Sequence, residues 1–532
     1  MKTGEYEYVF VGSGVAGATV ASRLLEKDPT TSILVLEAGP EIVTKNRRYW
    51  WDYVVHDRKP YASTYDQPGE YQTLGNTFWD FVENRVLAYG GSTLHWGGWS
   101  FRFKPEDFHL KESTGEGANW PFGYDTLEDY YWEAEKYLSV CGNVEESWNH
   151  HRKHQPYPVP HFHWTEADGE MIEAFQAQRI NIEPGRLPVA RYRKCMATGT
   201  CKYCPLGARF TAQLILDDLR SNPLHTRFEV RCLSPATQIL MDSKKRAKGV
   251  EYIDPTTGQT KRAMAKAVIV CSGAYESPKL LMLSRSSFWP NGIGNDYDLL
   301  GRFVISHSML KVTGTTPENK RCWIQEYDFP TLMSRTHDTE KDQQVGKILL
   351  FKNRALPNLD YAAEMINGAS HQEIEDKLHG TRVMELQAFL EEKGRFENRL
   401  TIGPGKNRLG LPCTQINFNR TETEIKNARS RLDLMENVIK QMGYKVVKKN
   451  VDNPGGHHTT GTCRMGTTPE EGVTDANLRV HGTENLYVCS NAAFPTGSAV
   501  NPTLTLTALS FRLADHLNPA PTKLAQLQRT GQ

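Results

Sequence analysis

Residues 8–17, YVFVGSGVAG, decide the fold class of this chain, because they join an apolar strand to a helix through a glycine-rich turn. The pattern predicts a buried strand at Tyr8–Gly12, a helix at Val15–Glu26 and a second buried strand at Ser32–Glu37. Two parallel strands joined by a helix are the repeating unit of a parallel sheet. The N-terminal region is therefore predicted to have an α/β fold.

The glycine spacing in this unit is typical of a dinucleotide-binding turn. Gly12 permits the tight turn, Gly14 lets the backbone approach a pyrophosphate, and Gly17 allows the helix to pack closely on the strand. Glu37 ends the second strand, where an acidic side chain accepts hydrogen bonds from ribose hydroxyls. Because a carboxylate repels a 2′-phosphate, the turn predicts FAD or NAD and argues against NADP.

Composition excludes several classes of function. The chain has 532 residues, 39% hydrophobic and 23% charged, as in an ordinary globular protein. Its formal charge of +1 offers no basic excess to neutralise phosphates, so no nucleic-acid partner is expected. No stretch approaches the roughly 18 apolar residues of a membrane helix, and the N-terminus lacks the pattern of a signal peptide. We expect a cytoplasmic location by default, or a periplasmic one if a signal-bearing partner exports the chain.

The rest of the chain alternates between strand-rich and irregular regions. A β-meander is expected at Thr237–Asp242, Lys248–Asp254 and Ala267–Val270. Residues 42–84 show no clean period and are expected to form a long surface excursion or lid. Further helices are predicted in four places: Leu127–Cys141, Ala369–His379, Glu422–Met442 and Leu504–His516.

Four motifs along the chain resemble those of the glucose–methanol–choline (GMC) oxidoreductases, in the order in which that family carries them. They are Gly90–Trp96 (GGSTLHW), Ser272–Leu281 (SGAYESPKLL), His458–Gly466 (HTTGTCRMG) and Asn501–Thr505 (NPTLT). The resemblance implies a Rossmann-like FAD-binding domain and an interleaved substrate-binding domain built on an antiparallel sheet. It places the first domain at about 1–110, 205–310 and 455–532, and the second at about 111–204 and 311–454.

The resemblance also assigns a catalytic pair. His458 occupies the position of the family's catalytic histidine, and Asn501 that of its His or Asn partner. The chemistry agrees, because alcohol oxidation needs a group that takes the hydroxyl proton, and a neutral imidazole is suited to this near neutral pH. The alternative is that His458 caps a loop and Asn501 lies in a turn before proline. The neighbouring His457 is expected to be structural.

The resemblance implies a set of FAD-binding residues and leaves open how FAD is attached. A histidine at the position of His95 carries a covalent flavin in some members of the family, and in others the flavin is held without a bond. The implied cofactor-binding residues are Gly12, Gly14, Gly17, Glu37, Gly91, Ser92, His95, Trp96, Val230, Pro502 and Thr503.

Three of the ten cysteines lie within ten positions, at Cys195, Cys201 and Cys204. Some sugar dehydrogenases of the family carry a similar segment that ligates an iron–sulfur cluster, although the last gap here is one residue shorter. Three thiolates suit such a cluster. A zinc site that lacks a fourth ligand, or cysteines that only pack a loop, are the alternatives. The histidines at 150, 151 and 154 are expected to lie in a solvated loop.

Two departures from the family pattern favour its carbohydrate branch, which includes bacterial sugar dehydrogenases and pyranose oxidase. The chain has Ser490-Asn491-Ala492 where many members have Asp-Ala-Ser, and Ser306-His307 where many have Asp-His. The second difference is expected to affect a structural hydrogen bond rather than the active site.

The predicted function is FAD-dependent oxidation of a hydroxyl of a sugar or glycoside to the carbonyl. Electrons would pass to an external acceptor such as a cytochrome or a quinone, and a small signal-bearing subunit would accompany the chain if the cluster is real. An oxidase that uses O2 is the first alternative. A non-catalytic flavoprotein that transfers electrons is the second, and the pair His458 and Asn501 argues against it, because a scaffold needs neither residue.

Overall fold

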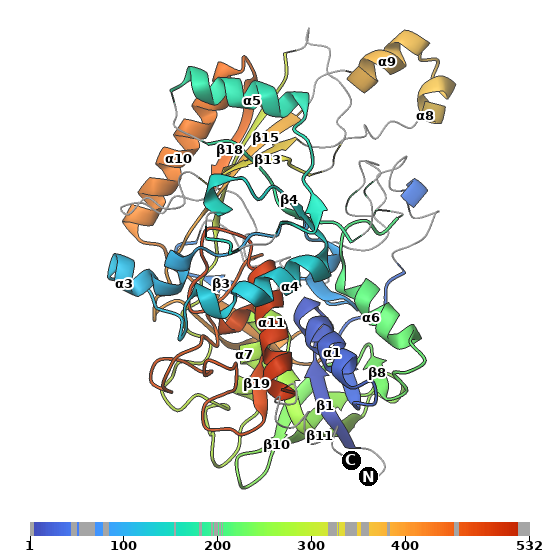
Figure 1. The fold of residues 1–532 in the computed structure, drawn as a ribbon, viewed down its shortest axis with the longest axis vertical. Coiled ribbons are helices and arrows are strands. Elements are labelled where there is room, and N and C mark those ends of the chain that lie inside the picture. The colour runs from blue at the N-terminus through green and yellow to red at the C-terminus, as the bar shows by residue number, and fades with distance from the viewer. Residues whose placement is uncertain are drawn as a thin grey trace, which may run out of the picture.

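The structure is a computed structural model of the whole chain. It describes residues 5–43, 50–52, 70–77, 85–149, 151–153, 156–179, 183–192, 195, 201, 204, 206–317, 327, 329–335, 348–352, 361–379, 383–451 and 457–519. In Figure 1 the N-terminal sheet lies in the lower half of the molecule and a second large sheet in the upper half.

The lower sheet has seven strands, and its centre confirms the strand–helix–strand prediction. Strand β1 (Glu5–Val11) pairs in parallel with β2 (Ile33–Leu36) and with β11 (Thr260–Val270). Helix α1 (Val15–Lys27) connects β1 to β2. The remaining strands are β8 (Phe228–Arg231) and β19 (Leu486–Val488), both parallel to their neighbours, and the antiparallel β9 (Ala236–Met241) and β10 (Ala247–Ile253). The β-meander is therefore confirmed, with a last strand that begins earlier than expected.

Both faces of the lower sheet are covered, as expected for parallel strands. One face packs against three helices, α1, α6 (Ala212–Ser221) and α11 (Thr503–Leu517), and contributes Phe10 and Val35 to their common core. The opposite face, with Val9 and Leu34, packs against α7 (Gly273–Leu283). The predicted helix at Leu504–His516 is thus confirmed as α11.

The upper sheet has six antiparallel strands in the order β18, β12, β15, β14, β13 and β6. Their bounds are Lys445–Val451, Ser308–Thr315, Val383–Leu390, Ile348–Lys352, Leu332–Ser334 and Gly185–Arg186. Helices α10 (Glu422–Gln441) and α5 (Glu166–Ala177) cover one face of this sheet (Figure 1). Helix α10 confirms the prediction at Glu422–Met442, and the one at Ala369–His379 corresponds to α9 (His371–His379), preceded by α8 (Tyr361–Ile366).

One predicted helix is present but ends earlier than expected, and one segment expected to be irregular contains a strand. The helix expected at Leu127–Cys141 ends early as α4 (Glu128–Leu138), because Ser139 adopts a left-handed conformation and Val140–Gly142 forms strand β4. The region 42–84 was expected to lack regular structure, but Tyr71–Leu74 forms strand β3, which pairs in parallel with β17 (Pro412–Asn417). That partner lies more than 300 residues away, so no local pattern marks the strand.

Short elements complete the fold. The remaining strands are β16 (Arg399–Lys406), beside β17, and β5 (Val159–Pro160) and β7 (Val189–Ala190), beside β4. Helix α3 spans Leu110–Thr114, and the 3-10 turns are η1 (Gly91–Leu94), η2 (Pro105–His109), η3 (Tyr124–Thr126), η4 (Ser147–Asn149) and η6 (Asn491–Ala493). The domain boundaries given by the sequence stay a prediction.

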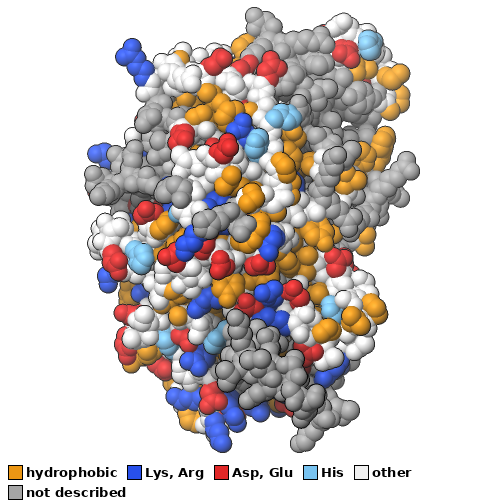
Figure 2. Space-filling model, viewed as in Figure 1, with side chains coloured by type: hydrophobic (Ala, Val, Ile, Leu, Met, Phe, Trp, Pro, Cys, Tyr) orange, Lys and Arg blue, Asp and Glu red, His pale blue; other side chains and the backbone are white. Residues whose placement is uncertain are grey.

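Two features concern nucleic-acid and membrane partners: the distribution of surface charge, and the length and hydropathy of the helices. On the face in Figure 2, Lys and Arg side chains are interspersed with Asp and Glu, and no single basic area dominates the described part of it. Within the described ranges, no helix is both long and apolar enough to cross a membrane.

Candidate active site

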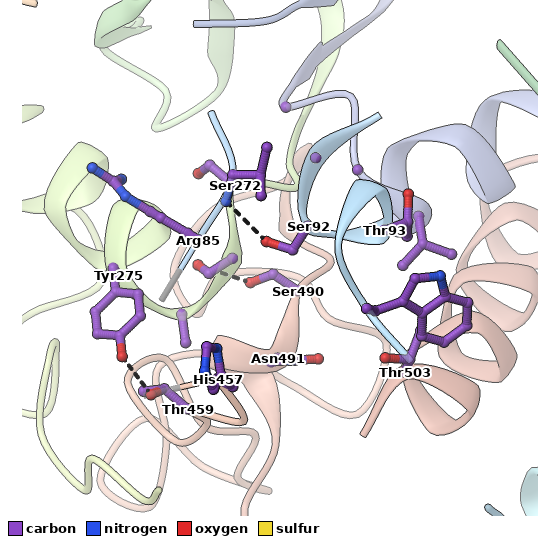
Figure 3. A pocket seen from close by; sticks show the side chains of 18 of the residues that line it. Arg85, Ser92, Thr93, Ser272, Tyr275, His457, Thr459, Ser490, Asn491 and Thr503 are labelled. Carbon is purple, nitrogen blue, oxygen red and sulfur yellow. Dashed lines mark hydrogen bonds between the residues drawn. The ribbon is translucent and has the colours of Figure 1, made fainter. Parts of the chain in front are cut away.

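A cavity of about 770 Å³ is lined by both the lower and the upper sheet regions. Its walls come from the glycine-rich turn after β1, the turn η1, the start of α7, residues 457–459, the start of α11, and strands β12 and β15. In Figure 3, Ser92 and Thr93 of η1 and Thr503 of α11 lie at the cavity. The hydroxyl groups of Tyr275 and Thr459 form a hydrogen bond beside it. Segments far apart in sequence therefore share one cavity.

The glycine turn has the geometry that the sequence predicted. Gly12 has φ of +105°, and a Cβ there would lie 2.8 Å from the carbonyl oxygen of Cys271. A Cβ on Gly17 would lie 2.5 Å from the carbonyl oxygen of Gly12. Gly14, in contrast, has no atom within 4 Å of such a Cβ, so it leaves open space at the start of α1. Two glycines permit backbone contact, and the third exposes the helix N-terminus to a ligand.

Glu37 lines the cavity and is buried, with 5% of its surface exposed. The backbone N–H and the hydroxyl of Ser13 donate to its Oε2, at 3.1 and 2.5 Å, and the N–H of Gly39 donates to its Oε1 at 2.8 Å. Burial raises the pKa of Glu37 above its usual value, and these donors offset part of that rise. Ser13 also accepts a hydrogen bond from the N–H of Gly90, so one hydroxyl joins the two glycine-rich segments.

The second glycine-rich segment closes over the first. A Cβ on Gly91 would lie 3.0 Å from the Cα of Gly14, and Ser92, His95 and Trp96 also line the cavity. The indole N–H of Trp96 donates to the carbonyl oxygen of Phe210 at 2.8 Å, which fixes the ring. His95 lies edge-on to His457, with 5.8 Å between ring centroids.

The structure places most, but not all, of the predicted cofactor-binding residues at the cavity. Pro502 and Thr503 line it at the start of α11. Gly17 supports the turn from behind, as its packing role requires. Val230 lies in β8 opposite Val35 and is not a lining residue; Pro235 and Ala236, which follow β8, line the cavity instead.

His458 is held between two partners at the cavity wall. Its Nε2 lies 3.0 Å from Nδ2 of Asn501, and its Nδ1 lies 2.9 Å from Nδ1 of His307. The Nε2 of His307 lies 3.3 Å from the carbonyl oxygen of Gly497. The structure thus brings the predicted pair together and adds His307, which the sequence analysis assigned to a structural role.

These contacts determine where the protons lie on His458. A carbonyl oxygen can only accept, so Nε2 of His307 carries a proton and Nδ1 of a neutral His307 is an acceptor. Nδ1 of His458 must then donate to it, which leaves Nε2 of His458 unprotonated. A histidine in this tautomer has its basic lone pair at the nitrogen that faces Asn501 and can accept a proton there.

An aromatic ring and a second histidine flank this group. Phe389 of β15 lies 5.3 Å from His458 between ring centroids, with the planes tilted by 30°. His457 was expected to be structural; it lines the same cavity beside His95.

A buried ion cluster at the start of α7 was not anticipated. Oε1 of Glu276 lies 2.6 Å from Nη1 of Arg85 and accepts a hydrogen bond from the Tyr71 hydroxyl at 2.9 Å. Its Oε2 lies 3.6 Å from Nζ of Lys279. Burial alone would raise the pKa of Glu276, but Arg85 and Lys279 outweigh it and hold that pKa below its usual value. Arg85, Glu276 and Lys279 all line the cavity.

The three clustered cysteines do not form a metal site in the described part of the chain, where no group of three or more His, Cys, Asp or Glu side chains could hold a metal ion. Cys201 lines the cavity and accepts a hydrogen bond from Arg191 at 3.4 Å, while Cys195 and Cys204 are half-buried. Iron–sulfur ligation therefore stays a prediction. His151 lies edge-on to Tyr124, and residues 150 and 154 are outside the described residues.

The fold and the cavity define the class of protein. It is an α/β protein in which a glycine turn of the dinucleotide-binding type and His458 line the same cavity. Two family models described as GMC oxidoreductase match the chain, at residues 164–300 and 395–510. A lycopene cyclase model matches residues 7–75, which contain the strand–helix–strand unit. The chain belongs to the GMC oxidoreductase family and is an FAD-dependent oxidoreductase that acts on CH–OH groups.

Relatives with assigned activities align over nearly the whole chain. The fructose dehydrogenase large subunit of Gluconobacter japonicus is 25% identical, over 96% of this chain and 97% of its own. The 6'''-hydroxyparomomycin C oxidase of Streptomyces lividus is 26% identical, over 96% and 92%. Among solved structures, pyridoxine 4-oxidase from Mesorbium loti shares the fold, with a TM-score of 0.67, 18% identity and coverage of 96% and 99%.

Proposed function

We propose that this protein oxidises a hydroxyl of a sugar or glycoside to the carbonyl, with His458 as the base and Asn501 as its partner. The observation that carries the proposal is the placement of His458 at the cavity wall, with its Nε2 3.0 Å from Nδ2 of Asn501 and its Nδ1 2.9 Å from Nδ1 of His307. Relatives that act on fructose and on an aminoglycoside support the substrate class.

The residues around the cavity fit FAD. The open space at Gly14, the start of α1 and the buried acceptor Glu37 suit its pyrophosphate and ribose. Bound FAD would supply the acceptor for the hydride that leaves the alcohol carbon.

The chain's own residues would handle the proton. Nε2 of His458 accepts the hydroxyl proton of the substrate, and the Nδ1–H bond to His307 orients the resulting imidazolium. The amide of Asn501, whose Nδ2 lies 3.0 Å from Nε2 of His458, would donate to the same oxygen without titrating and so fix it in the reacting position. Phe389 packs beside the ring of His458 and limits its movement.

The acceptor of the electrons is proposed to be external to this chain. A cytochrome or a quinone would make it a dehydrogenase, and O2 would make it an oxidase; the relatives include both. One of them is named as a large subunit, which supports a small partner subunit for this chain as well. Because the described cysteines do not assemble into a metal site, no electron-transfer step is assigned to them.

An anaerobic titration tests the function. Glucosides added to the purified, FAD-loaded protein should bleach the flavin absorbance, and the His458→Ala variant should not bleach on the same time scale. Admission of air then separates the acceptors: rapid recovery of the colour indicates an oxidase, and recovery only with quinone or cytochrome indicates a dehydrogenase. Failure of sugars and glycosides to bleach the parent protein would overturn the substrate class.

Covalent attachment of FAD through His95 is tested separately. His95 lines the cavity at the end of η1, which supports it as the attachment point. Precipitation with acid in denaturant should give a yellow pellet from the parent and a colourless one from His95→Ala. A colourless parent pellet would show that the flavin is held without a bond.

A further inference from the structure

One amide side chain at the cavity wall has no hydrogen-bond partner among the described residues. Asn491 begins the turn η6, shortly after strand β19, and lines the cavity. Its Oδ1 is buried, and neither atom of the amide makes a hydrogen bond within the described ranges. Buried polar groups in native proteins nearly always have partners, so this exception needs a physical reason.

The neighbouring hydroxyl, in contrast, is fully engaged. Oγ of Ser490 lies 3.1 Å from Oγ of Ser277, donates to the carbonyl oxygen of Gly273 at 3.4 Å, and accepts from the N–H of Ala492 at 3.3 Å. One hydroxyl thus caps η6 and joins it to the start of α7. The polar contacts to the protein at this place are made by Ser490, and the side chain of Asn491 takes no part in them.

The backbone of η6 is also held from a second side. The N–H of Cys463 donates to the carbonyl oxygen of Ala492, and the N–H of Met465 donates to that of Ala493, both at 2.8 Å. Both alanines are fully buried. Because Asn491 belongs to this fixed segment, its side chain is preorganised to bind a ligand in the cavity.

Stability does not explain an asparagine at this position. A buried acceptor without a partner costs free energy, and an alanine would avoid that cost. Many members of the family have Asp-Ala-Ser where this chain has Ser490-Asn491-Ala492, so alanine is common in place of Asn491. Alanine therefore fits the turn, and the amide of Asn491 is an addition that the fold does not require.

One side of Asn491 leads to the glycine turn. Its neighbour Ser490 donates to Gly273, and the preceding residue, Ser272, has its Cα 3.3 Å from the place that a Cβ on Gly12 would take. The glycine turn and the start of α1 suit the pyrophosphate of FAD. The phosphate part of the cofactor would therefore lie on this side of Asn491.

The other side of Asn491 leads to the proposed catalytic pair. In the view of Figure 3, Asn491 lies between His457 and Thr503, which are close in sequence to His458 and Asn501. The flavin ring would lie on this side, because the alcohol must react next to His458. The ribityl chain joins the flavin to the pyrophosphate, and its polar substituents are hydroxyl groups.

We propose that the side chain of Asn491 binds a ribityl hydroxyl group of FAD. This inference rests on the binding of FAD in this cavity and is independent of the alcohol that is oxidised. A hydroxyl group both donates and accepts, and an amide offers a donor and an acceptor, so the two groups are complementary. An aspartate at this position would only accept, and it would place a negative charge near the phosphates.

Titration of the apoprotein with FAD tests this contact, with flavin fluorescence as the readout. All proteins carry His95→Ala, so that the flavin can be removed whether or not the parent attaches it covalently. Asn491→Leu keeps the size of the side chain and removes both polar groups, so its Kd for FAD should rise roughly tenfold. Asn291 is exposed in a turn and does not line the cavity, so Asn291→Leu is the matched control and should bind FAD like the reference protein.

Deoxy analogues of FAD identify the hydroxyl group that Asn491 binds. The reference protein should bind one of 2′-deoxy-, 3′-deoxy- and 4′-deoxy-FAD roughly tenfold more weakly than FAD. Asn491→Leu should bind that analogue and FAD to within about twofold of each other, because the hydrogen bond is already lost. Asn491→Ala, which introduces the residue common in the family, covers the case in which the leucine variant does not fold.

Two results would overturn the inference while the assignment of FAD as the cofactor stands. If Asn491→Leu and Asn491→Ala bind FAD as tightly as the reference protein, the amide makes no contact with the cofactor. If they lose affinity equally for FAD and for every deoxy analogue, Asn491 acts through the packing of η6. An apoprotein that binds no FAD at all would overturn both the inference and the cofactor assignment.

Discussion

The two walls of the cavity differ in which part of the chain they present. The wall built from the glycine turn and η1 offers backbone: Gly12, Gly14 and Gly91 bring main chain to the surface, and a Cβ would collide at Gly12. The wall built from β12 and β15 offers side chains, with Lys311, Glu385, Gln387 and Phe389 pointing inward. Backbone atoms are present whatever the side chain, so a backbone wall suits a cofactor that stays the same. A wall of side chains can be changed one residue at a time to suit a different substrate. Substitutions on the first wall should therefore affect folding and FAD binding, and those on the second should affect substrate.

The largest effect is expected at Gly17, which supports the backbone wall from behind. In Gly17→Val the new Cβ would lie 2.5 Å from the carbonyl oxygen of Gly12, so helix α1 cannot pack on its strand. We expect no folded, FAD-loaded protein, measured as yellow protein per cell. Gly14→Ala is the control: its Cβ meets no atom within 4 Å, so the chain should fold and melt like the parent while binding FAD more weakly. Equal yields for the two variants would contradict this division of roles.

The next effect concerns the proton. His458→Ala removes the acceptor but no support of the glycine turn, so flavin reduction by sugar should slow by a factor of about 10² or more with FAD retained. Stopped-flow absorbance measures the rate. A variant within threefold of the parent would show that another group is the base.

A smaller loss is expected when the tautomer of His458 is no longer fixed. His307→Leu removes the acceptor for its Nδ1–H and should lower kcat by roughly tenfold, because only part of the His458 population then carries its lone pair at Nε2. His307→Gln keeps both an acceptor and a donor and should recover most of the rate. If leucine and glutamine are equally harmful, His307 acts through packing rather than through its hydrogen bonds.

The ion cluster at α7 gives a pH-dependent effect on stability. The pKa of Glu276 is lowered in the folded state, so its contribution is present above the usual Glu pKa and is lost as the pH falls through the lowered value. Glu276→Gln leaves Arg85 and Lys279 without their carboxylate and should cost about 3 kcal/mol at neutral pH. The gap in melting temperature between parent and variant should be widest near pH 7 and narrow in acid. A gap that does not change with pH would exclude the charge as its cause.

The smallest change is expected for Trp96→Phe, which keeps the ring and removes one hydrogen bond to Phe210. The free energy of unfolding should fall by about 1 kcal/mol, with the flavin rate unchanged. Denaturant unfolding measures the first and stopped-flow the second.

The same contrast explains what the sequence could predict. The backbone wall depends on glycines within a few positions of each other, and their spacing alone indicated the turn, the helix and the acidic residue Glu37. His458 and Asn501 were found through short motifs, and the structure brings them within 3.0 Å.

The rest depends on contacts between distant strands. His307 was assigned to a structural bond because nothing near it in sequence shows that it contacts His458, and strand β3 was missed because β17 alone gives it a partner. Lys311 and Gln387 look like ordinary surface residues until the register of β12 on β15 places them on one face. The alternation of a strand predicts two faces but not what covers each of them.

The strand order of the lower sheet also determines when the sheet can form during synthesis of the chain. Strand β1 lies between β2 and β11, and β11 in turn pairs with β19, so the central strands come from segments near residues 10, 265 and 487. At about 5–20 residues per second, the ribosome needs from roughly half a minute to a minute and a half between β1 and β19. Until β11 has been synthesised, the apolar strand Tyr8–Val11 has only its neighbour β2 to pair with. Because residues 501–503 complete the cavity, FAD can be enclosed only after nearly all of the chain has been synthesised, and the waiting strand is a natural site for chaperone binding.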